Sequence, residues 1–115
     1  MVYYKMRKTE PGGNPMDERQ RATLIRNMTD NLPTLRKRMD ISQAEFAALI
    51  GVSRSTLAAI ENQKRPMTWN MFLALLLIFT KNKETDKLLS AMEIYTDELN
   101  GMIKHREQDG GQNHD

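Results

Sequence analysis

The sequence predicts an all-α protein, a compact bundle of about five helices that ends in a long C-terminal helix. Apolar residues recur at spacings of three and four along most of the chain, as they do on one face of a helix. No segment sustains the apolar–polar alternation of a half-buried strand. Serine, threonine and glycine stand where helices with this pattern would begin and end.

The composition fits a single globular domain. The 115 residues include no cysteine, which excludes a disulfide framework and a cysteine-based metal site. Residues 1–15 lack the apolar segment of a secretory signal, and the longest strongly apolar stretch, 71–79, is too short to span a membrane. We therefore expect an intracellular, cytoplasmic protein. Residues 1–16 are expected to form a flexible arm, and residues 106–115 a disordered tail.

Charge is distributed unevenly along the chain. Residues 17–65 carry nine Lys/Arg and six Asp/Glu, whereas residues 66–115 carry five and eight. The overall net charge of +2 hides this difference. The asymmetry points to the first half of the chain as the part that would meet an anionic partner.

The first helical region admits two interpretations. In one, a helix over 17–28 is followed by another over 31–39, with Asp30 as N-cap and Pro33 in the first turn, where a missing N–H costs little. In the other, a single long helix is kinked at Pro33. The sequence does not choose between them.

Two short helices follow, and their ends are marked. Ser42 and Glu45 have the spacing of a capping box, in which each side chain bonds the backbone N–H of the other. The helix that they begin stops at Gly51, which takes a left-handed conformation without steric cost. Ser53 is the expected N-cap of the next helix, which runs to about Asn62.

Two more helices are predicted beyond a basic turn at 63–66. Thr68 is the expected cap of a helix from Trp69 to about Thr80, which is apolar on nearly all sides, as buried helices are. The last helix is predicted over 84–104, with apolar residues at heptad spacing. The members of this seam are Leu88, Met92, Tyr95, Leu99 and Met102.

The two helices on either side of Gly51 are joined by only three residues, 51–53. So short a connection makes them cross at a steep angle, which a small shared core must hold. Ala47 leaves room for the helices to approach. The expected members of the shared core are Phe46, Ile50, Val52, Leu57 and Ile60.

The segment 43–61, QAEFAALIGVSRSTLAAIE, resembles the helix-turn-helix of the Xre/Cro-like family of phage repressors and bacterial regulators. The resemblance covers about 35–79. It implies a lambda-repressor-like bundle over 17–80 that binds double-stranded DNA sequence-specifically, as a homodimeric transcriptional regulator, here expected to be a repressor. The C-terminal helix over 81–105 would then serve dimerisation.

The resemblance makes the helix that begins at Arg54 the recognition helix, whose first residues reach deepest into the major groove. Arg54 is expected to read a guanine through two parallel hydrogen bonds, and a phosphate contact is the alternative. The other base-reading candidates are Ser55, Ala58 and Ala59. Because the family often has a longer polar residue at Ala59, specificity is expected to depend more on Arg54 and on DNA shape.

A second set of residues is expected to contact phosphates and set the register on DNA. Gln43 stands at a helix N-terminus, where its side chain and backbone N–H groups would meet a phosphate together. The other members of this set are Thr56, Asn62, Lys64 and Arg65. An ordinary solvated turn is the alternative for Lys64 and Arg65. The family usually has glycine in place of Gln63, which puts the geometry of this helix end in question.

The resemblance also pairs Arg36 with Glu61 in a partly buried ion pair. A cation beside Glu61 would keep its carboxylate from repelling phosphate, so the pair is assigned to structure and not to base reading.

Dimerisation is expected through the last two helices, because so short a chain has little interior in which to bury both. Their packing on each other within one subunit is the alternative. A dimer would read half-sites about 34 Å apart in a near-palindromic operator.

Other functions fit less well. The sequence offers no cysteine nucleophile and no Gly-rich phosphate loop in an ordered region, and His105 and His114 lack partners at metal-ligand spacing. We therefore predict no enzymatic activity, no cofactor, no metal and no membrane partner. The main rival is an antitoxin that binds its own promoter and a toxin protein, and a protein-interaction module without DNA binding is another.

Overall fold

The computed structural model describes residues 16–104, and all of these that are regular are helical, which confirms the all-α prediction. The helices are α1 (Glu18–Arg38), α2 (Gln43–Ile50), α3 (Arg54–Glu61), α4 (Trp69–Lys81) and α5 (Lys83–Asp86). A last helical run covers 97–104. The predicted arm up to residue 15, the tail at 106–115 and both histidines lie outside the described residues.

Of the two interpretations of the first region, the structure has the single long helix. α1 begins at a capping box in which Asp17 accepts from the Gln20 N–H at 2.8 Å, and it continues without a break to Arg38. Asp30 therefore lies inside the helix and is not a cap, and the two-helix interpretation is wrong. Pro33 inside a helix costs about 3 kcal/mol. Burial of each large apolar side chain returns about 1.5–3 kcal/mol, which outweighs this cost. The buried side chains of α1 are Leu24, Met28, Leu32 and Leu35.

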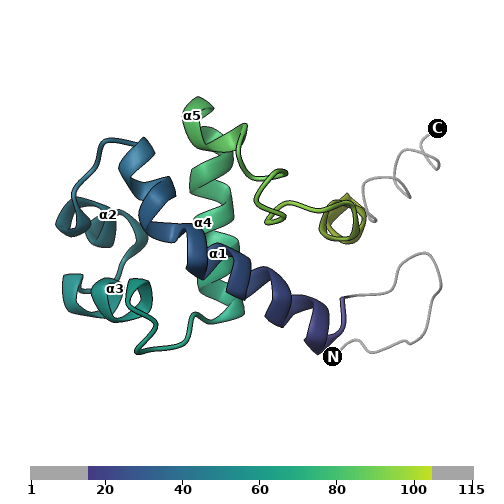
Figure 1. The fold of residues 1–115 in the computed structure, drawn as a ribbon, viewed down its shortest axis with the longest axis horizontal. Coiled ribbons are helices and arrows are strands. Elements are labelled where there is room, and N and C mark those ends of the chain that lie inside the picture. Colours follow the sequence, from purple (N-terminus) through teal and green to yellow (C-terminus); the bar gives the residue numbers. More distant parts are fainter. Residues whose placement is uncertain (1–15, 105–115) are drawn as a thin grey trace, which may run out of the picture.

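Figure 1 shows α1 lying across α4, with α2 and α3 together at one end of the pair. One buried cluster joins all of these helices. At its centre the ring of Phe46 on α2 stacks on Phe79 of α4, with ring centroids 5.6 Å apart. Met16, predicted as part of the flexible arm, is only 6% exposed and belongs to the same cluster.

α4 matches its prediction closely. The Thr68 hydroxyl accepts from the Met71 N–H at 3.1 Å and caps the helix, which runs one residue further than expected, to Lys81. The helix is short for a bilayer, and nothing else in the described part of the chain has the length and apolarity to cross one.

The predicted long helix over 84–104 is wrong. α5 ends at Asp86, and the chain then passes through turns before it becomes helical again at 97–104. The Ile94 N–H donates to the Leu89 carbonyl at 2.9 Å across a residue with φ of 58°, Glu93, which closes one of these turns. Asn27 of α1 holds the turn by donating to the Glu93 carbonyl at 2.9 Å.

The reason for this break is the burial of three residues spaced five apart, Leu89, Ile94 and Leu99. Each is at most 1% exposed. Positions five apart on a straight helix of 3.6 residues per turn point in widely different directions, so one helix would bury at most part of this set. The heptad seam is therefore not continuous. Leu99 packs inside its own subunit, and Leu88, Met92 and Tyr95 are half-buried in the turned segment.

Candidate nucleic-acid interface

The corner between α2 and α3 has the geometry that its sequence predicts. Ser42 and Glu45 form the capping box, with both hydrogen bonds at 3.1 Å. α2 ends at Gly51 with φ of 81°, and the Val52 N–H reaches back to the Ala47 carbonyl at 3.0 Å. A Cβ atom on Gly51 would meet nothing within 4 Å, so only the backbone conformation calls for glycine here.

The predicted shared core holds this corner. Phe46, Leu57 and Ile60 are at most 2% exposed, and Ile50 and Val52 pack half-buried at the edge of the same cluster. Inward placement of these side chains decides which side of α3 faces solvent. The corner therefore presents the start of α3 outward.

Arg54 and Ser55 stand exposed at that start. Ser53 caps the helix: its hydroxyl accepts from the Thr56 N–H at 3.0 Å and donates to the Thr56 hydroxyl at 2.9 Å. The Ser55 hydroxyl lies 3.2 Å from that of Ser53. The result is a cluster of three hydroxyl groups on the same helical turn as the exposed Arg54, at a helix end where backbone N–H groups carry partial positive charge.

The other predicted contact residues lie on α3 and its exit. Asn62, Lys64 and Arg65 are exposed, whereas Ala58 and Ala59 are half-buried. Arg54 and Ser55 at one end, with Lys64 and Arg65 at the other, thus bracket a helix about 12 Å long. The alanines between them offer only methyl groups.

The exit of α3 keeps the conformation of a glycine end although Gln63 occupies it. Gln63 has φ of 62°, and the Lys64 N–H reaches back to the Ala59 carbonyl at 2.8 Å, as Val52 does at the end of α2. The Gln63 amide also donates to Asp30 of α1 at 3.2 Å. The departure from glycine therefore leaves the geometry of the helix end intact and adds a link to α1.

The ion pair between Arg36 and Glu61 is confirmed. Arg36 Nε donates to Glu61 Oε2 at 2.8 Å and Nη2 donates to Oε1 at 3.2 Å, with side chains only 11% and 5% exposed. Arg36 Nη1 also donates to the Ile41 carbonyl at 3.3 Å. The paired guanidinium fork fixes α1 to the end of α3.

Gln43 also contacts this ion pair, and the sequence did not predict that contact. Its Nε2 donates to Glu61 Oε1 at 2.9 Å, so the side chain expected to meet a phosphate lies against a carboxylate. The backbone N–H groups at the start of α2 have no partner four residues earlier within the helix, and they remain the part of Gln43 suited to a phosphate. No signal in the sequence reveals this contact, because Gln43 and Glu61 meet only through the angle between α2 and α3.

Within residues 16–104 no cluster of His, Cys, Asp and Glu has the size to hold a metal ion. The arrangement is instead one of exposed donors: a guanidinium, hydroxyl groups, an amide and two further cations around one short helix. Donors of these kinds bind phosphate oxygens and the acceptor edges of bases.

Comparison with known families finds a match that covers about a third of the chain. Residues 34–68 match the family model described as Helix-turn-helix. The matched segment takes in the end of α1, all of α2 and α3, and the exit loop as far as the cap of α4. Comparison with curated proteins and with solved structures finds no match.

Proposed function

We propose that the protein is a homodimeric repressor that binds double-stranded DNA sequence-specifically, because residues 34–68 match the Helix-turn-helix family model and resemble the Xre/Cro-like family in sequence. The helix-turn-helix is the DNA-binding unit of transcriptional regulators. The observation that carries the proposal is the exposure of Arg54 and Ser55 at the start of α3, while Leu57 and Ile60 on its other side are buried.

In the proposed complex α3 lies in the major groove with its first turn against the base edges. The Arg54 fork donates to O6 and N7 of a guanine, a contact worth about 1–3 kcal/mol of discrimination against another base. The Ser55 hydroxyl donates to a base or accepts from one. Ala58 and Ala59 contribute apolar contact, with a thymine methyl as the natural partner.

Phosphate contacts surround this readout and set its register. Lys64 and Arg65 bind the backbone beside the exit of α3, with Asn62 and Thr56 as further donors. Gln43 contributes through the N–H groups at the start of α2. The paired guanidinium of Arg36 neutralises Glu61, which would otherwise place an unpaired carboxylate close to the phosphates.

The pairing surface of the proposed dimer lies on the outer face of α4, because the expected heptad seam is interrupted. Ala74 and Leu77 are exposed there, Leu77 by 61%, and Leu73 and Ile78 flank them half-buried. These residues share one helix face. The small Ala74 beside Leu77 allows close approach of the same face of a second subunit. Burying each large side chain there contributes about 1.5–3 kcal/mol.

Selection of bound duplexes from a random library tests the proposal directly. A dimer with two-fold symmetry is expected to enrich a near-palindrome with half-site centres one helical turn apart. Transcription from a promoter that overlaps the recovered motif should then fall when the protein is added. Recovery of no motif, with equal binding to every duplex, would contradict sequence-specific recognition.

A further inference from the structure

We propose that the first half of α1 forms a second DNA-contact surface, in which Arg19 and Arg26 bind phosphates of the DNA flanking the site under α3. This inference rests on the proposed function and extends it beyond residues 34–68, the segment that matches the family. The ligand is the phosphate backbone of a duplex, so this contact adds affinity and register but reads no sequence.

Arg19 and Arg26 lie seven residues apart on α1, so they share one face and stand about 10 Å apart along the helix. Both are exposed. Within residues 16–104 neither forms an ion pair; the pairs there join Arg36 with Glu61 and Lys87 with Glu84. Their guanidinium groups are therefore available to an external anion.

The loop after α3 lies against the same side of α1 as Arg26. Gln63 donates to Asp30, and the Thr29 hydroxyl lies 4.0 Å from the Met67 sulfur. Thr29 and Asp30 are three and four residues beyond Arg26, which makes them its neighbours on the helix surface. Figure 1 shows the loop between α3 and α4 and the first turns of α1 along the same lower edge of the molecule.

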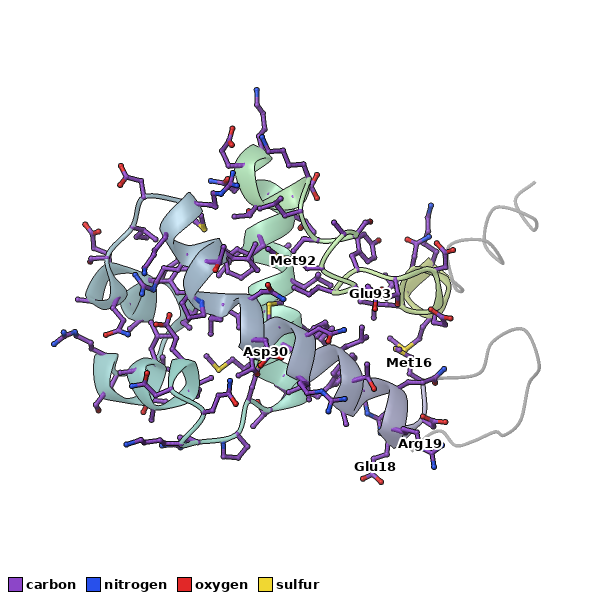
Figure 2. The ribbon with its side chains drawn as sticks, in the orientation of Figure 1. Met16, Glu18, Arg19, Asp30, Met92 and Glu93 are labelled. Carbon is purple, nitrogen blue, oxygen red and sulfur yellow. The ribbon has the colours of Figure 1, made fainter. Side chains whose placement is uncertain are left out.

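The cations proposed to face the duplex are all exposed: Arg54 at the start of α3, Lys64 and Arg65 in the loop, and Arg26 and Arg19 on α1. Figure 2 shows Arg19 at the lower edge, with its side chain pointing away from the body of the protein.

Three carboxylates lie near these cations. Asp30 accepts from the Gln63 amide, Asp17 accepts from the Gln20 N–H as the cap of α1, and Glu18 is exposed at the helix start beside Arg19. A duplex strand carries one phosphate per 3.4 Å of axial rise, so Arg19 would contact DNA about three base pairs further out than Arg26 if α1 followed the axis.

The test measures the salt dependence of binding to a fluorescein-labelled, mixed-sequence duplex of about 30 base pairs, with the full chain. Each phosphate contact contributes about 0.9 to the slope of log K against log salt. The double variant Arg19→Ala/Arg26→Ala should therefore lose about 1.8 in slope per subunit. Between about 50 and 200 mM salt its affinity should fall less than that of the wild type, by roughly tenfold for each bound subunit and so by roughly a hundredfold for a dimer.

Two further variants keep the result specific. Lys81→Ala/Lys83→Ala removes the same charge from the junction of α4 and α5, at the opposite edge in Figure 1, and should keep the wild-type slope. Arg19→Lys/Arg26→Lys should restore it, since lysine also binds phosphate as a point charge. A wild-type slope in the double alanine variant would overturn this inference and leave the proposed function standing. Absence of salt-dependent binding by the wild-type chain would overturn both.

Discussion

Arg54 is exposed on α3, whereas the large apolar side chains of the same helix are buried. Leu57 and Ile60 take the inward positions, and Ser53 uses its hydroxyl to cap the helix, so the guanidinium is the long donor left exposed at the tip. Lys64 differs in position, since it stands beyond the helix where it would meet the sugar–phosphate backbone. Removal of Arg54 and removal of Lys64 are therefore expected to impair DNA binding in different ways.

Arg54→Ala should relax the preference at one base pair of each half-site and cost about 1–3 kcal/mol on the recovered motif. Lys64→Ala should weaken binding to all sequences alike and lower the salt slope by about 1. Competition titrations with motif and scrambled duplexes measure both effects. An equal loss on every duplex for Arg54→Ala would reassign Arg54 to a backbone contact.

Glu61→Ala should destabilise the fold by about 3–5 kcal/mol, because it leaves the nearly buried Arg36 guanidinium without its partner. Glu84→Ala is the matched control. Its pair with Lys87 is more than half exposed, and such a pair contributes at most about 1 kcal/mol. Urea denaturation followed by circular dichroism gives both values. Similar midpoints for the two variants would show that the Arg36–Glu61 pair does not stabilise the fold.

At the scale of elements, a residue with positive φ follows the ends of α1, α2 and α3 and also closes the turn before Ile94. These residues are Asp40, Gly51, Gln63 and Glu93. Only one of the four is glycine, so three ends carry the steric cost of a side chain in the left-handed region. Tertiary contacts compensate at two of them, through Gln63 to Asp30 and Asn27 to the Glu93 carbonyl.

Two glycine substitutions separate the effect of backbone strain on stability from the effect of a steric clash. Gly51→Ala should lower the free energy of unfolding by about 1–2 kcal/mol through strain alone, because no atom lies within 4 Å of the added Cβ. Gly101→Ala, equally free of contacts but within the helical run 97–104, should raise it by about 0.5–1 kcal/mol. Chemical denaturation of both variants checks the opposite signs. A stabilised Gly51→Ala variant would contradict the role given to the left-handed turn.

At the scale of the whole molecule, the C-terminal segment completes the core of the subunit. Leu89, Ile94 and Leu99 join the same buried cluster as α1 and α4. The segment that the heptad pattern assigned to a partner is thus largely used within one chain. Three large apolar side chains stay exposed in the described residues, Leu49, Leu77 and Ile103; Leu77, on the outer face of α4 where the proposed dimer pairs, is the most exposed of them.

Leu77→Glu should shift the protein toward monomer without unfolding it, since the side chain is already 61% exposed in the subunit. DNA affinity should fall with it, because each subunit would then bind a half-site alone. Leu49→Glu, at a site 54% exposed on α2, is the matched control and should leave the association state unchanged. Sedimentation equilibrium of both variants decides the matter. An unchanged dimer in Leu77→Glu would place the pairing surface elsewhere.

The amino-acid sequence by itself determined the features that depend on hydrogen bonds within a few residues. The capping box at Ser42, the left-handed stop at Gly51 and the caps at Ser53 and Thr68 are all local, and so is the apolar spacing of α2 and α3. The pattern that resembles a helix-turn-helix is built from these same features, which is why it could be predicted before the fold was known.

Only the tertiary structure decided where distant residues had to be buried together. Packing of Leu32 and Leu35 carries α1 through Pro33, and burial of Leu89, Ile94 and Leu99 breaks the C-terminal heptad. Gln43 finds Glu61 only because the corner brings them together. Local propensities differ by about 1 kcal/mol or less for most residues, whereas burial of one large side chain contributes about 1.5–3 kcal/mol. Where the two disagree, burial prevails.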